Sequence, residues 1–391
     1  MRILVATDDT VGAVMAGSAL RAYELARVLE RQGHELRLAA AGSHPPGDES
    51  PPLVSEPPWG WAEAVVAPAW SLPPRAFLGR HLLIADGITP LLAELEAMPP
   101  TPARARRVRT AAARLPLVAA RADAVLTGGP AQVEWWSEQL RGRFGLPLLT
   151  VPFGIPDEPP PPERGSIPGV PDDWAVVLWW GGVWPWLDLD TLLAARALLG
   201  PAPVSVVVPV APRPGSGSLG WDAAALAEAA AAHGLAPPQV VALSSWVPYR
   251  DRHRILNRAA LVAVLHRSGD EATLSFRTRA LDALWAGVPL LLSEGGEVSR
   301  LARQLGWGEV VPPGDAAAAA AAIARLLGEG GQARCRSALS GSRPAWTWSR
   351  VVEPLLAALP ELPRVRRRAL LPAAIRAALA LRPGRAPEPT L

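Results

Sequence analysis

The chain opens on an alternation of short apolar runs and helix-like periodicity. Residues 2–7 form a continuous apolar stretch, and apolar positions then recur at helical spacing over 18–31. Gly33 follows that periodic stretch as a helix stop, and residues 34–39 form the next apolar run. A strand, a helix and a second strand in this order predict a parallel sheet covered by helices.

The rest of the first half continues the pattern as far as a run of prolines. Further strands are expected at 81–85, 124–127 and 148–151, and one intervening helix at 131–140. The Pro-rich stretch 44–58 is predicted to be a loop, and the loops over 44–70 are expected to contact the variable part of a substrate. Pro152 and residues 156–162, which include four consecutive prolines, form the strongest linker signal in the chain.

The second half repeats the alternation of strand and helix. Strands are expected at 175–180, 204–209, 240–243, 261–265 and 289–293. These runs are apolar without alternation, which indicates a parallel sheet buried on both faces. The fold class is therefore α/β, with two doubly wound, Rossmann-like domains and a ligand in the cleft between them. The expected division is an N-terminal domain at 1–156, a linker at 157–172, a C-terminal domain at 173–345, and a helix and basic tail at 346–391 that returns to the N-terminal domain.

Composition fits a large globular protein and narrows its location. The chain has 391 residues, which is more than one hydrophobic core usually organises. Hydrophobic residues make up 49% of it and charged residues 19%. Nothing at the N-terminus resembles a signal peptide, and the longest apolar run, 174–187, is too short to span a bilayer. A single cysteine, Cys335, excludes an intramolecular disulfide and suits a reducing compartment. We expect a cytoplasmic protein, and the residue usage suggests a bacterial, GC-rich genome.

The charge balance argues against nucleic acid as a partner. The sequence pI is 9.9, but the formal net charge is only +3, because every one of the cations is an arginine and none is a lysine. A broad basic field for phosphate backbones is therefore missing. Arginines do gather after Leu362, where an amphipathic helix on an anionic membrane is one hypothesis and a solvated helix packed on the N-terminal domain is the alternative.

The most informative segment is 269–289, which follows the expected strand 261–265. It opens a helix that Thr273 or Ser275 is expected to cap, and the N-terminus of a helix offers free N–H groups to a phosphate. Arg277 and Arg279 fall in the first turns, where they could bind a diphosphate. Glu271 lies just before the expected helix, where its carboxylate could accept hydrogen bonds from sugar hydroxyls. The alternative is a capped surface helix with solvated arginines.

The first half supplies fewer candidates. Gly12 and Gly17 separate the first strand from its helix and could let the backbone approach a ligand, or could serve a turn with positive φ. Their spacing is not the dinucleotide fingerprint, which disfavours a nicotinamide-dependent dehydrogenase. Asp86 follows the strand 81–85 and should face the cleft as a base or hydroxyl ligand, or else cap a helix. His81, at the start of that strand, is expected to be structural. No Cys/His metal set and no nucleophile elbow is present.

The order of several segments resembles the family 4 retaining glycosyltransferases, which have the GT-B fold. Besides 269–289, the matching segments are 18–37, 151–155, 177–184, 244–249, 306–311 and 313–315. The resemblance extends to about Leu356. It implies that a sugar moves from a nucleotide-diphosphate sugar to a hydroxyl acceptor with retention of configuration, by front-face attack in which the donor phosphate helps to deprotonate the acceptor. It also implies that no bound metal or other cofactor is required.

The resemblance carries site residues onto this sequence. Glu271 and Asp86, argued above from their positions after strands, are the expected catalytic carboxylates, and Gly17 and Arg21 are expected in the acceptor or phosphate loop. The donor-binding residues that the resemblance implies are Gly181, Gly182, Trp184, Trp246, Glu271, Leu274, Ser275, Arg277, Arg279 and Asp282.

Two departures from the family pattern keep other functions open. The two glutamates of the pattern fall on Leu274 and Asp282, so Glu271 is displaced, and the usual phosphate-binding Arg and Lys after the glycine loop are missing. Arg277 and Arg279 are expected to take over the phosphate charge. The alternatives are a nucleotide-sugar epimerase and a catalytically silent GT-B scaffold. The nucleotide base, the sugar, the acceptor and the oligomeric state cannot be predicted from the sequence.

Overall fold

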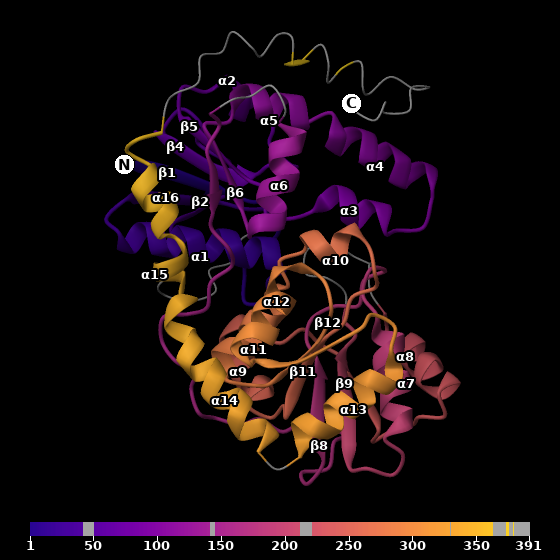
Figure 1. The fold of residues 1–391 in the computed structure, drawn as a ribbon. Helices are drawn as coiled ribbons and strands as arrows, with labels where there is room; N and C mark the ends of the chain where they lie inside the picture. Colours follow the sequence, from indigo (N-terminus) through magenta and orange to yellow (C-terminus); the bar gives the residue numbers. More distant parts are fainter. Residues whose placement is uncertain are drawn as a thin grey trace.

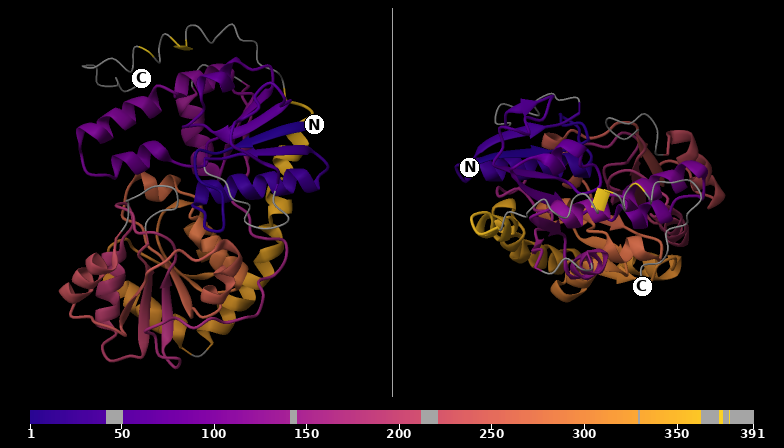
Figure 2. Two further views of the ribbon diagram at one scale, coloured as in Figure 1. Left: turned by 180° about the vertical axis from the view of Figure 1, so that it is seen from behind. Right: turned by 90° about the horizontal axis from the view of Figure 1, so that it is seen from above.

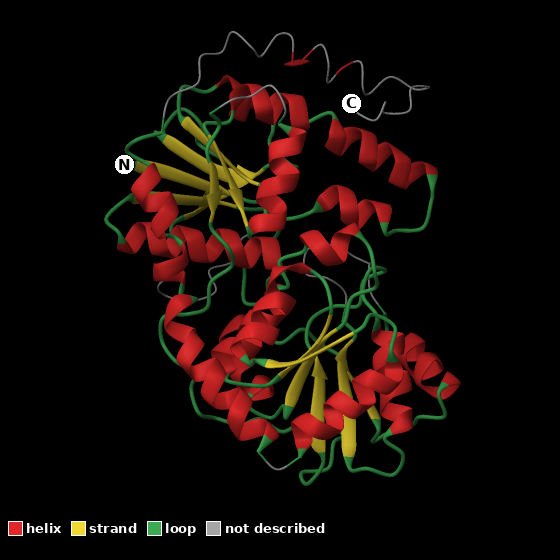
Figure 3. Cartoon of the chain, viewed as in Figure 1, coloured by secondary structure: helices red, strands yellow, loops and turns green. Residues whose placement is uncertain are grey.

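The computed structural model describes residues 1–41, 51–140, 145–211, 221–328 and 330–362, with 373–374 and 378. Two parallel sheets with helices on their faces form its upper and lower halves (Figure 1; Figure 3). All the arginines after Leu362 lie outside the described residues, so the structure does not test the membrane hypothesis built on them. Within the described residues, no helix is both long enough and apolar enough to cross a bilayer.

The first sheet has seven parallel strands in the order β3-β2-β1-β4-β5-β6-β7. Its strands are β1 (Arg2–Ala6), β2 (Glu35–Ala39), β3 (Leu53–Val54), β4 (Ala64–Pro68), β5 (Leu82–Asp86), β6 (Ala124–Thr127) and β7 (Leu148–Thr150). Its helices are α1 (Gly17–Arg31), α2 (Pro74–Leu78), α3 (Leu91–Glu96), α4 (Pro102–Ala112), α5 (Leu115–Arg121) and α6 (Pro130–Gln139).

Two expectations for this half were wrong. The segment 44–70, expected to be loop, contains the central strand β4, which pairs with β1 on one side and β5 on the other. The same segment contains β3, which extends the sheet from β2. Ala64–Pro68 is short and rich in alanine, so its apolar signal was weak, yet its position between two strands buries nearly all of it.

The second sheet has six parallel strands in the order β10-β9-β8-β11-β12-β13. Its strands are β8 (Ala175–Trp179), β9 (Val204–Pro209), β10 (Val240–Leu243), β11 (Leu261–Val264), β12 (Leu290–Ser293) and β13 (Gly308–Val311). Its α-helices are α7 (Leu189–Leu198), α8 (Ala223–Ala232), α9 (Arg252–Leu256), α10 (Asp270–Leu274), α11 (Thr278–Ala286), α12 (Gly296–Leu305), α13 (Ala316–Leu327) and α14 (Gly331–Ser342). The expected strands all form, with ends that differ by one residue at most.

After α14 the chain turns back to the first half through α15 (Trp348–Val351) and α16 (Glu353–Ala358). Figure 2 shows this segment running along the side of both halves. Helix α15 packs on α1, and Ile155 exchanges backbone hydrogen bonds with the segment around Thr347. The linker and the returning segment therefore lie together.

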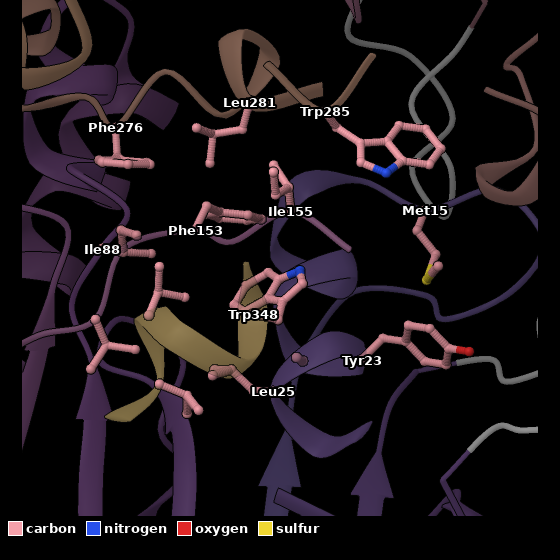
Figure 4. Packing of buried hydrophobic residues seen from close by; sticks show 14 of the residues in the cluster. Met15, Tyr23, Leu25, Ile88, Phe153, Ile155, Phe276, Leu281, Trp285 and Trp348 are labelled. Atoms are coloured by element: carbon pink, nitrogen blue, oxygen red, sulfur yellow. The ribbon is translucent and has the colours of Figure 1, made fainter. Parts of the chain in front are cut away.

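A shared apolar cluster joins the two halves. Phe276 of the second half lies beside Ile88 of the first, with Phe153 and Trp348 behind them (Figure 4). Phe276 also lies close to the backbone of Gly128, where an added Cβ would lie 3.1 Å from the Phe276 side chain. Burial of aromatic area at this contact stabilises one arrangement of the two halves. That arrangement sets the width of the cleft between them.

Candidate active site between the two sheets

A cavity of about 790 Å³ lies where the carboxyl ends of both sheets face each other. In doubly wound folds, ligands bind beyond the carboxyl ends of parallel strands. The first half contributes the segment after β1, the start of α1 and the end of β5, and the second half contributes the glycine loop after β8 and the segment from β11 to α11. Among the expected site residues, the cavity lining includes Gly17, Arg21, Asp86, Gly181, Gly182, Trp184, Trp246, Glu271, Ser275, Arg277, Arg279 and Asp282.

The glycine loop closes over Arg279. Gly181 has φ +89°, and a Cβ at this position would lie 3.2 Å from Nε of Arg279, so both conformation and space call for glycine. Nη2 of Arg279 donates to the carbonyl of Gly182 at 2.7 Å. Nη1 is buried and has no hydrogen-bond partner among the described residues. Burial lowers the pKa of Arg279 to about 10, which leaves it charged at neutral pH. A charged donor without a partner beside a backbone loop suits an anion.

Arg277 has a different role from the one expected. Its Nη1 donates to the carbonyl of Ser293 at 2.5 Å and to Oγ of Ser299 at 2.6 Å. Its Nη2 donates to the carbonyls of Ala272 and Glu294. This arrangement does not favour the expected binding of phosphate by Arg277, because only its Nε lacks a partner in the described part of the chain. Arg277 instead ties α10 to the end of β12 and to α12.

The helix expected to start near Thr273 is two helices with a break between them. The first, α10, begins after Gly269, and Ser275 ends it, while α11 begins after Arg277. Neither Thr273 nor Ser275 is an N-cap, because the hydroxyl of Thr273 bonds back to the carbonyl of Gly269 inside α10. Thr278, the first residue of α11, lies at the cavity wall.

Glu271 lies inside α10, not before it, and is buried at 4% exposure. Its Oε2 lies 2.7 Å from Nδ1 of His266, a residue with equal burial that directly follows β11. Burial raises the pKa of Glu271 to about 7, against the opposing effects of Ser275, Arg277 and Arg279. Burial also lowers the pKa of His266 well below its usual range, and the two arginines add to that effect. The neutral forms of both groups are therefore favoured.

The residues at the two family glutamate positions behave differently. Leu274 is absent from the cavity wall, and its carbonyl accepts a hydrogen bond from Nε2 of Gln132 across the two halves. Asp282 lies at the wall, where it accepts from Nε1 of Trp180 at 2.8 Å and from Nε of Arg252 at 3.0 Å. Asp282 thus holds Trp180, the residue before the glycine loop.

Tryptophans cover the outer wall of the second half. Trp184 stacks with Trp186, with ring centroids 6.2 Å apart. Trp246 donates from Nε1 to the carbonyl of Ala211 and also lines the cavity. Aromatic faces of this kind suit a planar base or the apolar face of a sugar.

In the first half, Arg21 and Asp86 form one buried unit. Nε of Arg21 donates to Oδ2 of Asp86 at 2.6 Å, and its other nitrogens donate to the carbonyls of Val151 and Pro152. Asp86 is therefore an ion-paired carboxylate, which weakens its candidacy as a base. It does not cap a helix either, since its Oδ1 receives the amide of Ile88 and the next helix starts at Leu91.

Gly17 is the first residue of α1, whose N-cap position has no side-chain hydrogen bond. A Cβ at Gly17 would meet nothing within 4 Å, and its φ is not positive, so the turn explanation does not hold for it. Open space at the start of a 15-residue helix lets a ligand approach its free N–H groups. As expected for a structural residue, His81 is buried and bonds the carbonyl of Ala76.

Several cavity residues were missed in the sequence. His266 and Arg267 follow β11, and the rule that ligands bind beyond strand ends could have found them. Arg252 and Tyr249 could not have been found from local sequence. Arg252 lies 3.7 Å from the ring centre of Tyr249, whose hydroxyl donates to Oε1 of Glu24 at 2.7 Å across the two halves. In the described part of the chain, no group of His, Cys, Asp and Glu side chains could hold a metal ion.

No family sequence model matches the chain, and no curated protein sequence matches it. Solved structures do match over nearly the whole length. Sucrose-phosphate synthase from Thermosynechococcus elongatus has a TM-score of 0.65 at 14% identity, with 93% of this chain and 99% of that chain covered. Anabaena HepE in complex with UDP-glucose has a TM-score of 0.65 at 15% identity, with 92% and 100% covered. WaaG, a glycosyltransferase involved in lipopolysaccharide biosynthesis, has a TM-score of 0.62 at 16% identity, with 91% and 98% covered. Taken with the two parallel sheets that face each other across the cavity, these matches show that the chain has the two-domain GT-B fold of glycosyltransferases.

Proposed function

We propose that this protein is a retaining glycosyltransferase that moves a sugar from a nucleotide-diphosphate sugar to a hydroxyl acceptor without a metal ion. The observation that carries the proposal is the charged, half-buried Arg279 beneath the Gly181–Gly182 loop, whose buried Nη1 lacks a partner among the described residues. A diphosphate is the part of a nucleotide sugar that such a donor and loop would bind. Similarity to HepE, which was solved with UDP-glucose, supports a nucleotide sugar as the ligand.

The reaction needs little covalent chemistry from the protein. The bond between the anomeric carbon and the diphosphate oxygen breaks, and a new bond forms from the acceptor oxygen on the same face of the sugar. The acceptor proton passes to an oxygen of the departing diphosphate. Arg279 and the N–H groups at the start of α11 would stabilise the charge that develops on the diphosphate. The ion-paired Asp86 would orient an acceptor hydroxyl and would not remove its proton.

Direct binding is the first test. Calorimetric titration with UDP, GDP and TDP, each without metal, should identify one nucleoside diphosphate that binds. Arg279→Ala should weaken that affinity about 10- to 100-fold, because a charge-assisted hydrogen bond in a buried site is lost. Arg303→Ala is the matched control, since this arginine is 60% exposed and pairs with Glu294. Absence of binding by all three ligands would contradict the proposal and favour the silent scaffold.

Product analysis separates the remaining alternatives. A transferase needs an acceptor for turnover, and NMR of the product should show the anomeric configuration of the donor. An epimerase would convert the donor sugar with no acceptor present.

Location is a separate part of the proposal. We infer action in the cytoplasm. For residues 362–391, peripheral contact with an anionic membrane is one hypothesis, and a solvated helix packed on the N-terminal domain is the alternative. Co-sedimentation with anionic liposomes, lost on deletion of those residues, would support the contact, and absence of any sedimentation would exclude it.

A further inference from the structure

The cavity contains a buried carboxyl that the family pattern does not place. Glu271 lies three residues before the family position, and the residue at that position, Leu274, is not in the cavity lining. The carbonyl of Leu274 is instead used in the contact with Gln132 that joins the two halves. A carboxyl buried to 4% exposure requires a polar partner that both stabilises and orients it.

That partner is His266, and its own position is fixed on three sides. Its amide donates to Oγ of Ser293 at 2.8 Å, and its backbone forms an antiparallel bridge with Leu187. Its ring nitrogen Nδ1 then meets Oε2 of Glu271 at 2.7 Å. The strand end that carries His266 is thus attached both to the neighbouring strand β12 and to the segment after the glycine loop. A side chain held in this way has little freedom to let the carboxyl rotate.

The other buried histidines of the described chain show what a structural histidine looks like here. His81 bonds the carbonyl of Ala76, and His253 bonds the carbonyl of Arg250. Neither of them lies in the cavity lining, whereas His266 and Glu271 both do. His253 also lies 3.6 Å from Glu163, but that carboxylate is 60% exposed and outside the cavity lining, whereas the partner of His266 is a buried carboxyl of the cavity wall.

We propose that His266 is a positioning residue that holds the Glu271 carboxyl toward the sugar of the bound donor. The proposal rests on the function proposed above, because it assigns Glu271 to the sugar and Arg279 to the diphosphate. Only one proton can occupy the hydrogen bond between Nδ1 and Oε2. In one form neutral His266 donates to the carboxylate, and in the other the carboxyl donates to the imidazole. In both forms Oε2 is engaged by His266, and the side chain of Ser275 adds a hydrogen bond to the same carboxyl, so the two residues together set its orientation.

The test compares ligands with and without the sugar. His266→Leu removes the hydrogen bond and should lower kcat/KM for transfer about 10- to 100-fold, the usual effect of losing a hydrogen bond to a charged group. Its affinity for the nucleoside diphosphate alone should stay within about twofold of wild type, because no diphosphate contact changes. His266→Asn places an amide donor near the position of Nδ1 and should recover most of the activity. His253→Asn is the matched control, a buried histidine of the same half that lies outside the cavity lining.

A double-mutant cycle decides whether the effect passes through Glu271. In the Glu271→Ala background, which has no side-chain partner for Nδ1, His266→Leu should cause no further loss in kcat/KM, since coupled residues are not additive. Additive losses would overturn the proposal, as would wild-type activity in His266→Leu or an equal loss of affinity for the bare nucleoside diphosphate. If His266→Leu does not fold, the comparison of His266→Asn with His253→Asn decides in the same way. Failure of wild type to bind any nucleoside diphosphate would instead refute the proposed function itself.

A measurement without ligand distinguishes failure of the His266 proposal from failure of the proposed function. The imidazole NMR signals of His266, assigned by their loss in His266→Asn, should shift in Glu271→Gln, while those of His253 should not. No shift at His266 would contradict the contact whether or not the protein is a transferase.

Discussion

Replacing Glu271 by glutamine should make the stability of this protein less dependent on pH. Burial raises the pKa of Glu271 from 4.5 to about 7 in the folded state. A carboxyl with a raised folded pKa contributes stability that is fully present below pH 4.5 and is lost as the pH rises through about 7. Above pH 7 the wild-type fold contains an ionised buried carboxylate, and glutamine at this position cannot ionise.

The size of the effect follows from the shift. One pKa unit corresponds to about 1.4 kcal/mol, so a shift from 4.5 to about 7 corresponds to about 3 kcal/mol between the extremes of pH. Relative to wild type, Glu271→Gln should therefore gain about 3 kcal/mol in free energy of unfolding between pH 4.5 and pH 8. His266, whose pKa is lowered by burial, costs stability as the pH falls below its unfolded value near 6.5, but it is present in both proteins and largely cancels in the difference.

Urea denaturation followed by tryptophan fluorescence at pH 4.5, 6, 7 and 8 measures the difference directly. Glu353→Gln is the control, because this glutamate is 52% exposed and pairs with Arg350, away from the cavity between the sheets. A difference between wild type and Glu271→Gln that is constant from pH 4.5 to 8 would refute the argument that burial controls this carboxyl.

Three further predictions concern the framework of the site. Arg277→Met should lower the free energy of unfolding by about 3 kcal/mol in urea denaturation, because it leaves several buried carbonyls without donors; a loss below about 1 kcal/mol would contradict the cross-linking role. Gly181→Ala should lower the free energy of unfolding by about 2 kcal/mol and weaken the binding of a nucleoside diphosphate in calorimetry. Gly200 is also at positive φ but has open space around it, so Gly200→Ala should cost only about 1 kcal/mol and leave that binding affinity unchanged. Tyr249→Phe should cost about 1 kcal/mol by removing the hydrogen bond to Glu24, and the loss should disappear when it is measured in a Glu24→Ala background.

The sheets could be predicted from the sequence because their signal is local. A run such as Val204–Pro209 is apolar at nearly every position, and burial on both faces of a parallel sheet requires that pattern. Strand Ala64–Pro68 was not predicted, because a short run that includes alanines has a weak hydrophobic signal. Its pairing with β1 and β5 makes it a central strand. The break between α10 and α11 was missed as well, since the segment 270–286 has no proline or glycine to mark it.

The sequence by itself indicated two α/β sheets, the GT-B fold through its resemblance to a family, and residues 269–289 as the candidate ligand-binding segment of the second half. Only the tertiary structure decided which side chains in that segment are available to the ligand. Arg277 and Arg279 are equivalent in sequence, yet Arg277 is used up by carbonyls around β12 and Arg279 keeps a donor in the cavity. Arg277 is the non-helical residue before α11 and Arg279 lies in the first turn of that helix, so neighbours of identical chemistry point to different surroundings. Those surroundings come from segments far away in the chain, and no local pattern records them.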